Sequence, residues 1–147
     1  MATRRKEKPV RAAPLRSADY VRLASFRAAL RRFLRFSEAE AARAGLNGQQ
    51  YQALLAIRGY PEGGPVTIND LARQLLIKHN SAVGLVDRLV AEQLLRREGV
   101  AQDRRKVHLR LTRRGESVLE RLAATHRAEL RRVAPLIRGF LGEISRD

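Results

Sequence analysis

The chain has 147 residues and no cysteine, and its 30 lysine and arginine residues face 15 aspartate and glutamate residues, which gives a net charge of +15. This length predicts one domain, and the absence of cysteine excludes disulfides, thiolate metal sites and cysteine nucleophiles. No apolar run approaches the roughly 20 residues of a membrane span and no secretory signal is evident, so we expect a cytoplasmic protein without membrane contact. The charge excess favours a polyanionic partner, chiefly nucleic acid.

Residues 1–16 predict a disordered basic arm, because prolines interrupt them and few of them are apolar. The arm has six basic residues against Glu7 alone, which gives it +5 and leaves +10 on the rest of the chain. The folded part is therefore basic as well. The arm itself either contacts DNA or is a solvated tail, and both interpretations stay open.

Residues 17–44 predict a long helix that Gly45 ends. Apolar side chains recur along it at spacings of three and four residues, namely Leu23, Phe26, Leu30 and Phe33. Leu34 and Phe36 widen this apolar face beyond one stripe. A small monomer offers too little surface to cover such a helix, so the pattern indicates a homodimer.

Capping boxes predict the next two helix starts. Asn47 with Gln50 begins a helix within residues 46–59, and Thr67 with Asp70 begins a short helix. In a capping box each of the two side chains accepts a hydrogen bond from the other residue's backbone N–H, so these four residues fix the start of both helices.

A second short helix, from about residue 79 or 80 to residue 92, follows the turn at 76–78. Its inner face repeats every three or four residues and comprises Ala82, Leu85, Val86 and Leu89. Two short helices joined by a turn of this length predict a helix-turn-helix.

From residue 94 on, the spacing of apolar residues changes from the helical period to every second residue. Residues 94–100 predict a strand, 101–105 a charged turn, and 106–111 a second strand with alternating apolar residues. Thr112 caps a final long helix, which Pro135 should kink or restart. We therefore predict a mostly α fold with a small β-hairpin wing, in which a winged helix (46–112) lies between two dimerisation helices (17–44 and 113–147).

This pattern resembles the multiple antibiotic resistance regulator (MarR) family over about residues 20–145. The most specific segments are Leu46-x-x-Gln49-Gln50-Tyr51-x-x-Leu54-Leu55, Thr67-Ile68-x-Asp70-Leu71-Ala72, Val86-Asp87-Arg88-Leu89 and Asp103-Arg104-Arg105-Lys106-Val107-x-Leu109-x-Leu111-Thr112-x-x-Gly115. The resemblance implies a dimer with interlocked terminal helices, one winged helix per protomer on a palindromic operator, and, in many members, release of DNA by a small ligand. Two residues depart from the family pattern: Lys78 replaces a small hydroxyl residue before the second short helix, and Gln93 replaces a glycine after it.

The outer face of the second short helix is the predicted DNA-contacting surface. Its residues are small or polar, as entry into a major groove requires, and they are Asn80, Ser81, Val83, Gly84, Asp87 and Arg88. Gly84 is costly in a helix, and close DNA approach, tight packing and simple tolerance all explain it. Asp87 is expected to hold an arginine. Lys78 and His79 are predicted to meet a phosphate at the helix N-terminus, with a solvated turn as the alternative.

The wing carries Arg104, Arg105 and Lys106. A narrow minor groove attracts arginine, and the resemblance implies that Arg104 or Arg105 enters that groove while the other pairs with Asp103. We favour Arg104 for the groove. Structural salt bridges for both arginines are the alternative.

A small aromatic or anionic ligand is a further predicted partner, with Tyr20, Phe26, Phe33 and Tyr51 as candidate lining residues; for each of them plain core is the favoured explanation. No enzyme is expected, because the three histidines are scattered and no phosphate loop, nucleophile elbow or dinucleotide fingerprint occurs. No cofactor or metal is expected either. RNA binding is disfavoured, because aromatic stacking platforms are missing.

The sequence thus predicts a double-stranded DNA-binding transcriptional regulator, acting as a ligand-responsive repressor and a homodimer. The alternative is a winged helix that only contacts proteins, which would not need the basic wing.

Overall fold

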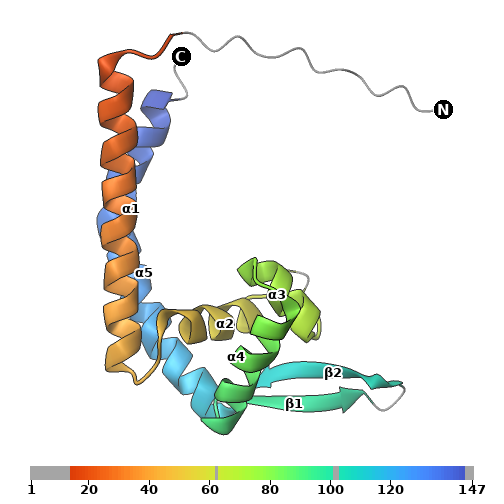
Figure 1. Ribbon diagram of the computed structural model, residues 1–147. Helices are drawn as coiled ribbons and strands as arrows, with labels where there is room; N and C mark the ends of the chain where they lie inside the picture. Colours follow the sequence, from red (N-terminus) through yellow and green to blue (C-terminus); the bar gives the residue numbers. More distant parts are fainter. Residues whose placement is uncertain (1–13, 62, 101–102, 145–147) are drawn as a thin grey trace, which may run out of the picture.

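The computed structural model describes residues 14–61, 63–100 and 103–144, with side chains described for all of these except residues 100, 103–105 and 144. Most of the predicted basic arm therefore lies outside the described residues. Within them the element order is α1–α2–α3–α4–β1–β2–α5. Figure 1 shows α1 and α5 as a long pair of helices, with α2, α3, α4 and the two strands gathered at one end. The predicted mostly α fold with a β-hairpin wing is confirmed.

The element bounds follow the predicted ranges closely; they are α1 Ser17–Arg43, α2 Gly48–Arg58, α3 Ile68–Leu75, α4 His79–Ala91, β1 Leu95–Val100, β2 Asp103–Leu111 and α5 Arg113–Ile144. The charged turn predicted at 101–105 is too long, because β2 already begins at Asp103. A register shift between Gly99 and Val100 lets Val100 pair with Asp103, and charged side chains do not prevent such pairing at a solvated hairpin end. The helix α5 continues through Pro135 without restarting.

Gly45 ends α1 as predicted. It adopts a φ of +77°, which favours glycine, and its N–H donates to the Ala42 carbonyl at 3.0 Å while the Leu46 N–H donates to the Ala41 carbonyl at 2.9 Å. These two bonds form a Schellman motif, which satisfies the last carbonyls of the helix. Leu46 is thereby turned into the core.

Both predicted capping boxes are present. The Gln50 N–H donates to Asn47 Oδ1 at 2.8 Å and the Asn47 N–H donates to Gln50 Oε1 at 2.9 Å. Thr67 and Asp70 exchange the same two bonds at 2.9 and 3.2 Å. The Thr67 N–H also holds the pKa of the Asp70 carboxyl below its usual value, because a hydrogen bond to a carboxylate favours the charged form. The starts of α2 and α3 are thus fixed by local chemistry.

The core lies within the winged helix and at the base of α5. Its fully buried side chains include Leu54, Leu71, Leu85, Leu89, Leu94, Leu95 and Leu109. The Leu109 N–H donates to the Val66 carbonyl at 2.7 Å, so the segment before α3 is joined to β2 by an isolated antiparallel bridge. This core fixes α4 by one face and leaves its opposite face in solvent.

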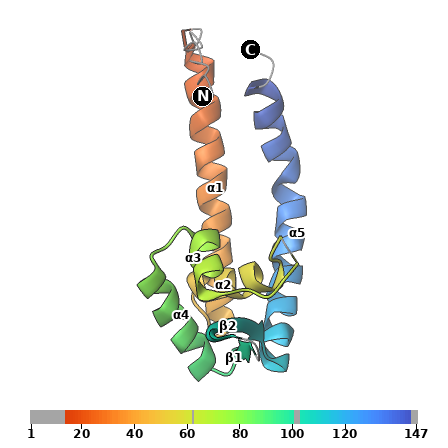
Figure 2. The ribbon, with the colours of Figure 1, turned by 90° about the vertical axis from the view of Figure 1, so that its right-hand side faces the viewer.

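The arm helices keep much apolar surface exposed. α1 and α5 run alongside one another away from the winged helix (Figures 1 and 2), and large apolar side chains on them stay exposed by 45% or more, namely Tyr20, Val21, Leu23, Leu34, Leu130, Leu136 and Leu141. Even so, none of the helices in the described part of the chain has a stretch that is both long and apolar enough to span a membrane.

Candidate nucleic-acid interface

The helix α4 divides into a buried and an exposed face. Ala82, Leu85, Val86 and Leu89 are 0% exposed, as the 3.6-residue period predicts. The predicted DNA-contacting residues Asn80, Ser81 and Arg88 are exposed, whereas Val83 and Gly84 are half-buried. The structure therefore gathers the predicted set on one side of α4, with Val83 and Gly84 closest to the core.

The start of α4 has no side-chain cap. Lys78 is the N-cap residue, and its side chain accepts no hydrogen bond from the first turn, because an ammonium group has no acceptor. Backbone N–H groups of the first helical turn therefore lie beside an exposed cation, which is an arrangement suited to phosphate. His79 Nδ1 lies 2.7 Å from Asn69 Oδ1 on α3, so this contact links the two helices of the helix-turn-helix.

Leu76 is an exposed residue that the sequence did not single out. It occupies the turn between α3 and α4, has a φ of +54° and is 93% exposed. A left-handed leucine is uncommon because its Cβ crowds the backbone. Its place two residues before Lys78 puts an apolar side chain next to the predicted DNA-contacting surface. The sequence signal was a leucine in a turn, a position where glycine or asparagine is usual.

Asp87 forms an ion pair with Arg97 of β1, which agrees with the prediction that Asp87 holds an arginine. The pair joins α4 to the wing and neutralises the one carboxylate on the outer face of α4. A carboxylate left unpaired there would repel phosphate. The pair therefore removes an electrostatic obstacle to DNA at the centre of α4.

Gly84 has room for a side chain within the protein. An added Cβ would meet only Arg88 Nη1, at 3.8 Å, which is ordinary van der Waals contact. Tight packing inside the chain therefore does not explain this glycine. Two explanations of Gly84 remain: a partner molecule approaches the helix closely at this position, or the helix simply tolerates a glycine there.

The wing is an antiparallel hairpin of β1 and β2, in which Leu95 pairs with Leu111 and Arg97 with Leu109. Lys106 is exposed on it. Arg104 and Arg105 are part of β2. The structure describes the backbone of residues 103–105 but not their side chains. The predicted groove insertion of Arg104 therefore stays a prediction.

Ion pairing separates two groups of cations among the described residues of the winged helix. One group is bound to carboxylates, in the pairs Arg58–Glu116, Arg73–Asp70, Arg96–Glu98, Arg97–Asp87 and Arg110–Glu98. Lys78, Arg88 and Lys106 form no ion pair there. All three belong to the predicted set, so the uncompensated charge of the winged helix lies at the start of α4, on its outer face and on the wing.

The four predicted ligand residues have different surroundings in the single chain. Tyr20 is 60% exposed, and Phe26 packs edge-on against Phe140 with ring centroids 6.3 Å apart. Phe33 and Tyr51 both contact His126, at centroid distances of 6.2 and 4.3 Å.

His126 is the centre of the junction between the arms and the winged helix. It is 5% exposed, and its ring nitrogens lie 2.7 Å from the Leu122 carbonyl and 2.7 Å from Ser37 Oγ. Burial at this junction also raises the pKa of Tyr51. The sequence alone assigns His126 no role, because its contacts come from α1 and α2, which are distant in sequence.

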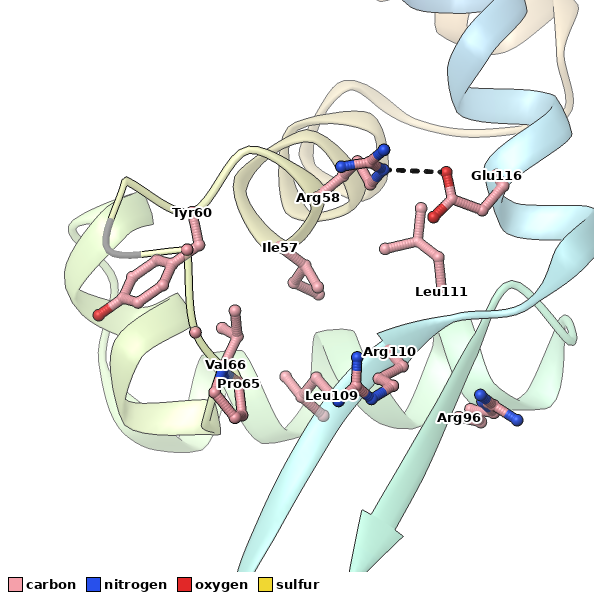
Figure 3. A pocket seen from close by; sticks show the side chains of 12 residues that line it. Ile57, Arg58, Tyr60, Pro65, Val66, Arg96, Leu109, Arg110, Leu111 and Glu116 are labelled. Atoms are coloured by element: carbon pink, nitrogen blue, oxygen red, sulfur yellow. Dashed lines mark hydrogen bonds and ion pairs between the residues drawn. The ribbon is translucent and has the colours of Figure 1, made fainter.

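A cavity of about 450 Å³ lies between α2, β2 and the start of α5. Figure 3 shows its apolar walls, including Ile57 and Leu109, and the ion pair between Arg58 and Glu116. Its other two arginines, Arg96 and Arg110, are paired with Glu98. The cavity thus offers no unpaired charge, and none of the predicted ligand residues lines it. No group of residues able to hold a metal ion occurs in the described part of the chain.

Comparison with known proteins supports the fold independently. A model of the MarR family matches residues 44–106. The structure of AbsC, a MarR family transcriptional regulator from Streptomyces coelicolor, matches with a TM-score of 0.71 at 23% identity and covers 92% of both chains. A MepR variant from S. aureus, solved bound to an oligodeoxyribonucleotide, matches with a TM-score of 0.66 at 17% identity, over 88% of this chain and 96% of that one.

The YusO protein from Bacillus subtilis matches with a TM-score of 0.63 at 22% identity, over 82% of this chain and 86% of that one. No curated protein matches significantly by sequence. The family model covers the helix-turn-helix and most of the wing, and the solved structures extend the same fold over both arms. This chain is therefore similar to the MarR family over residues 44–106 and shares the winged-helix fold of the solved structures.

Proposed function

We propose that this protein is a transcriptional regulator that binds specific sites in duplex DNA as a homodimer. One observation supports this most: among the described residues of the winged helix, the cations without an ion pair lie at the start of α4, on its exposed face of small and polar residues, and on the wing. Phosphate contacts position such a protein, and base-edge contacts give it specificity. The MepR variant bound to an oligodeoxyribonucleotide is a protein of this fold that binds DNA.

In the proposed complex α4 enters the major groove. Asn80 pairs with adenine, Arg88 with guanine, and Val83 contacts a thymine methyl. Lys78 and His79 bind phosphate at the start of α4. Arg104 enters the minor groove, with Arg105 and Lys106 beside it on the wing. A dimer places its two α4 helices about 34 Å apart, on half-sites about 10 base pairs apart in a palindrome.

The dimer is proposed from the exposed apolar surface of the arms. We expect the wild-type protein to be a dimer at micromolar concentration by light scattering. Introducing charge with Leu23→Asp and Leu34→Asp should shift it to monomer, because both side chains are 46 to 47% exposed in the single chain and would be covered by the partner.

Leu76→Asp is the matched control, because Leu76 is 93% exposed but lies in the winged helix. It should leave the dimer intact. A wild-type protein that stays monomeric at this concentration would contradict the proposal.

We also propose that the regulator is a repressor that a small aromatic or anionic ligand releases from DNA. Phe33 and Tyr51 pack on His126 where α1 and α2 meet α5, so a ligand that separated these rings would move the winged helix relative to the arms. Tyr20 and Phe26 lie further along α1 and belong to this site only if the dimer partner completes it.

The site assignment is tested by comparing α4 and the wing. An operator is first obtained by selection from a random duplex library with the protein itself. Ser81→Ala and Arg88→Ala should each cost about 1 to 3 kcal/mol on that duplex and much less on a scrambled one, because they remove base contacts.

Arg104→Ala should weaken binding to both duplexes by similar factors, because the minor groove attracts arginine by its width and potential. All titrations use one fixed salt concentration. Equal losses on both duplexes for Ser81→Ala and Arg88→Ala would show that the outer face of α4 does not contact bases. No duplex binding at all would favour a winged helix that contacts only proteins.

A further inference from the structure

The arm helices carry arginines that the proposed operator complex does not use. On α1 these are Arg27, Arg31, Arg32 and Arg35, and on α5 they are Arg121, Arg127, Arg131 and Arg138. All of them are exposed, and none forms an ion pair within the described residues. We call them the arm arginines.

Their spacing is unfavourable for an isolated helix. Arg27, Arg31 and Arg35 follow one another at intervals of four residues, as do Arg127 and Arg131. Residues four apart are neighbours on a helix surface, and like charges there destabilise it. Each interval rises about 6 Å along the axis, so the arm presents a line of closely spaced positive charges that a line of anions would neutralise.

The other charges of the arms do not neutralise them. Most arm carboxylates are already bound, in the pairs Asp19–Arg22, Glu143–Arg22, Glu40–Arg43, Glu116–Arg58 and Glu129–Arg132. Of the described carboxylates on α1 and α5, only Glu38 and Glu120 form no ion pair. A second copy of the chain brings the same excess of arginine, so dimerisation alone leaves most arm arginines uncompensated.

Most of the arm arginines also lie away from α4 and the wing. Figure 1 shows α1 and the C-terminal half of α5 extending from the winged helix. At 1.5 Å per residue, Arg35 and Arg27 lie roughly 15 and 27 Å along α1 from Gly45, where the winged helix begins. A duplex held by α4 and the wing therefore leaves this surface free.

We propose that the arm arginines bind the phosphate backbone of a second DNA duplex, so that one dimer joins two segments of DNA. The inference rests on the proposed function, because that function brings DNA to the protein. The contact is without sequence preference, since it involves phosphates only. Its affinity falls steeply with salt because bound arginines release counterions.

The test is a capture experiment with the full chain. Operator duplex on beads, in slight excess over dimer, occupies both winged helices, and a fluorescent non-operator duplex is then added at 50 mM salt. The test variant carries Arg27→Gln, Arg31→Gln, Arg127→Gln and Arg131→Gln. The control carries Lys at the same four positions, which keeps the charge.

Wild type and the Lys control should retain the fluorescent duplex, and the Gln variant should retain at least about ten-fold less. Operator affinity at trace DNA should change by less than about two-fold in the Gln variant, which also shows that it is folded. Failure of wild type to capture the second duplex, or equal capture by the Gln variant, would overturn the proposal.

Two further measurements separate the remaining outcomes. Vesicles containing phosphatidylglycerol replace the fluorescent duplex, and stronger retention of vesicles than of duplex would assign the surface to membranes instead. If no operator is bound, the proposed function fails. The second site is then measured alone, as direct binding of the fluorescent duplex by the Gln and Lys variants.

Discussion

Gly115→Ala should destabilise the protein by about 3 kcal/mol or more, because overpacking against rigid backbone has no cheap relaxation. A Cβ at Gly115 would lie 2.1 Å from the Leu94 carbonyl oxygen and 3.0 Å from its carbonyl carbon. That carbonyl already accepts a hydrogen bond from the Thr112 N–H at 3.1 Å. The start of α5 therefore cannot move away without breaking its own attachment to the winged helix.

Gly139→Ala is the matched control for this prediction. It is the same substitution in the same helix, and an added Cβ there meets nothing within 4 Å. It should stabilise by about 0.5 to 1 kcal/mol, because alanine restricts the unfolded chain and favours helix. Urea unfolding of both variants at one protein concentration measures the difference. Similar free energies of unfolding for the two variants would show that α5 does not pack on Leu94 this closely.

The reason for a glycine at position 115 could not be derived from the sequence. Glycine at this position belonged to the pattern that resembles the MarR family, but its physical reason is a carbonyl twenty-one residues away that only the folded chain brings near. Gln93, where the family pattern has glycine, adopts a φ of +60°. The backbone thus keeps the left-handed turn before Leu94 although the residue that favours it is absent.

Features set by neighbouring residues were predictable. The caps at Asn47 and Thr67, the end of α1 at Gly45 and the inner face of α4 depend on contacts within a few positions, and the structure confirms each of them. The predicted start of β2 at residue 106 was wrong, because the strand already begins at Asp103, and strand pairing at a hairpin end depends on the partner strand and its bulge.

Features set by contacts between distant elements were not predictable in the same way. His126 packs on α1 and α2, and the choice of which arginines form ion pairs depends on where the glutamates of other elements lie. The ring partners of the predicted ligand residues are an example: helical spacing places Phe26 and Phe33 on one face of α1, but α5 offers Phe140 to the first ring and His126 to the second. The unpaired cations at Lys78, Arg88 and Lys106 likewise emerged only from the fold.

These unpaired cations lead to the second large effect, which is the salt dependence of DNA binding. With about 6 to 10 phosphate contacts per dimer, affinity for the operator should fall roughly 10³- to 10⁵-fold between 50 and 200 mM salt, because each contact releases counterions. Measurement at trace duplex concentration restricts the titration to the first duplex. A nearly flat dependence would show that the net charge of +15 has another purpose than duplex binding.

Single substitutions locate the contacts within this slope. Lys106→Gln removes two phosphate contacts per dimer and should lower the slope of log affinity against log salt by about 1.8. Arg58→Gln is the charge-matched control, because Arg58 is held by Glu116 at 3.2 Å beside the cavity of Figure 3 and is not part of the surface around α4. Its slope should stay at the wild-type value. If both variants flatten the slope equally, the protein binds DNA through its overall charge, and the separation between paired and unpaired cations does not define the DNA-binding surface.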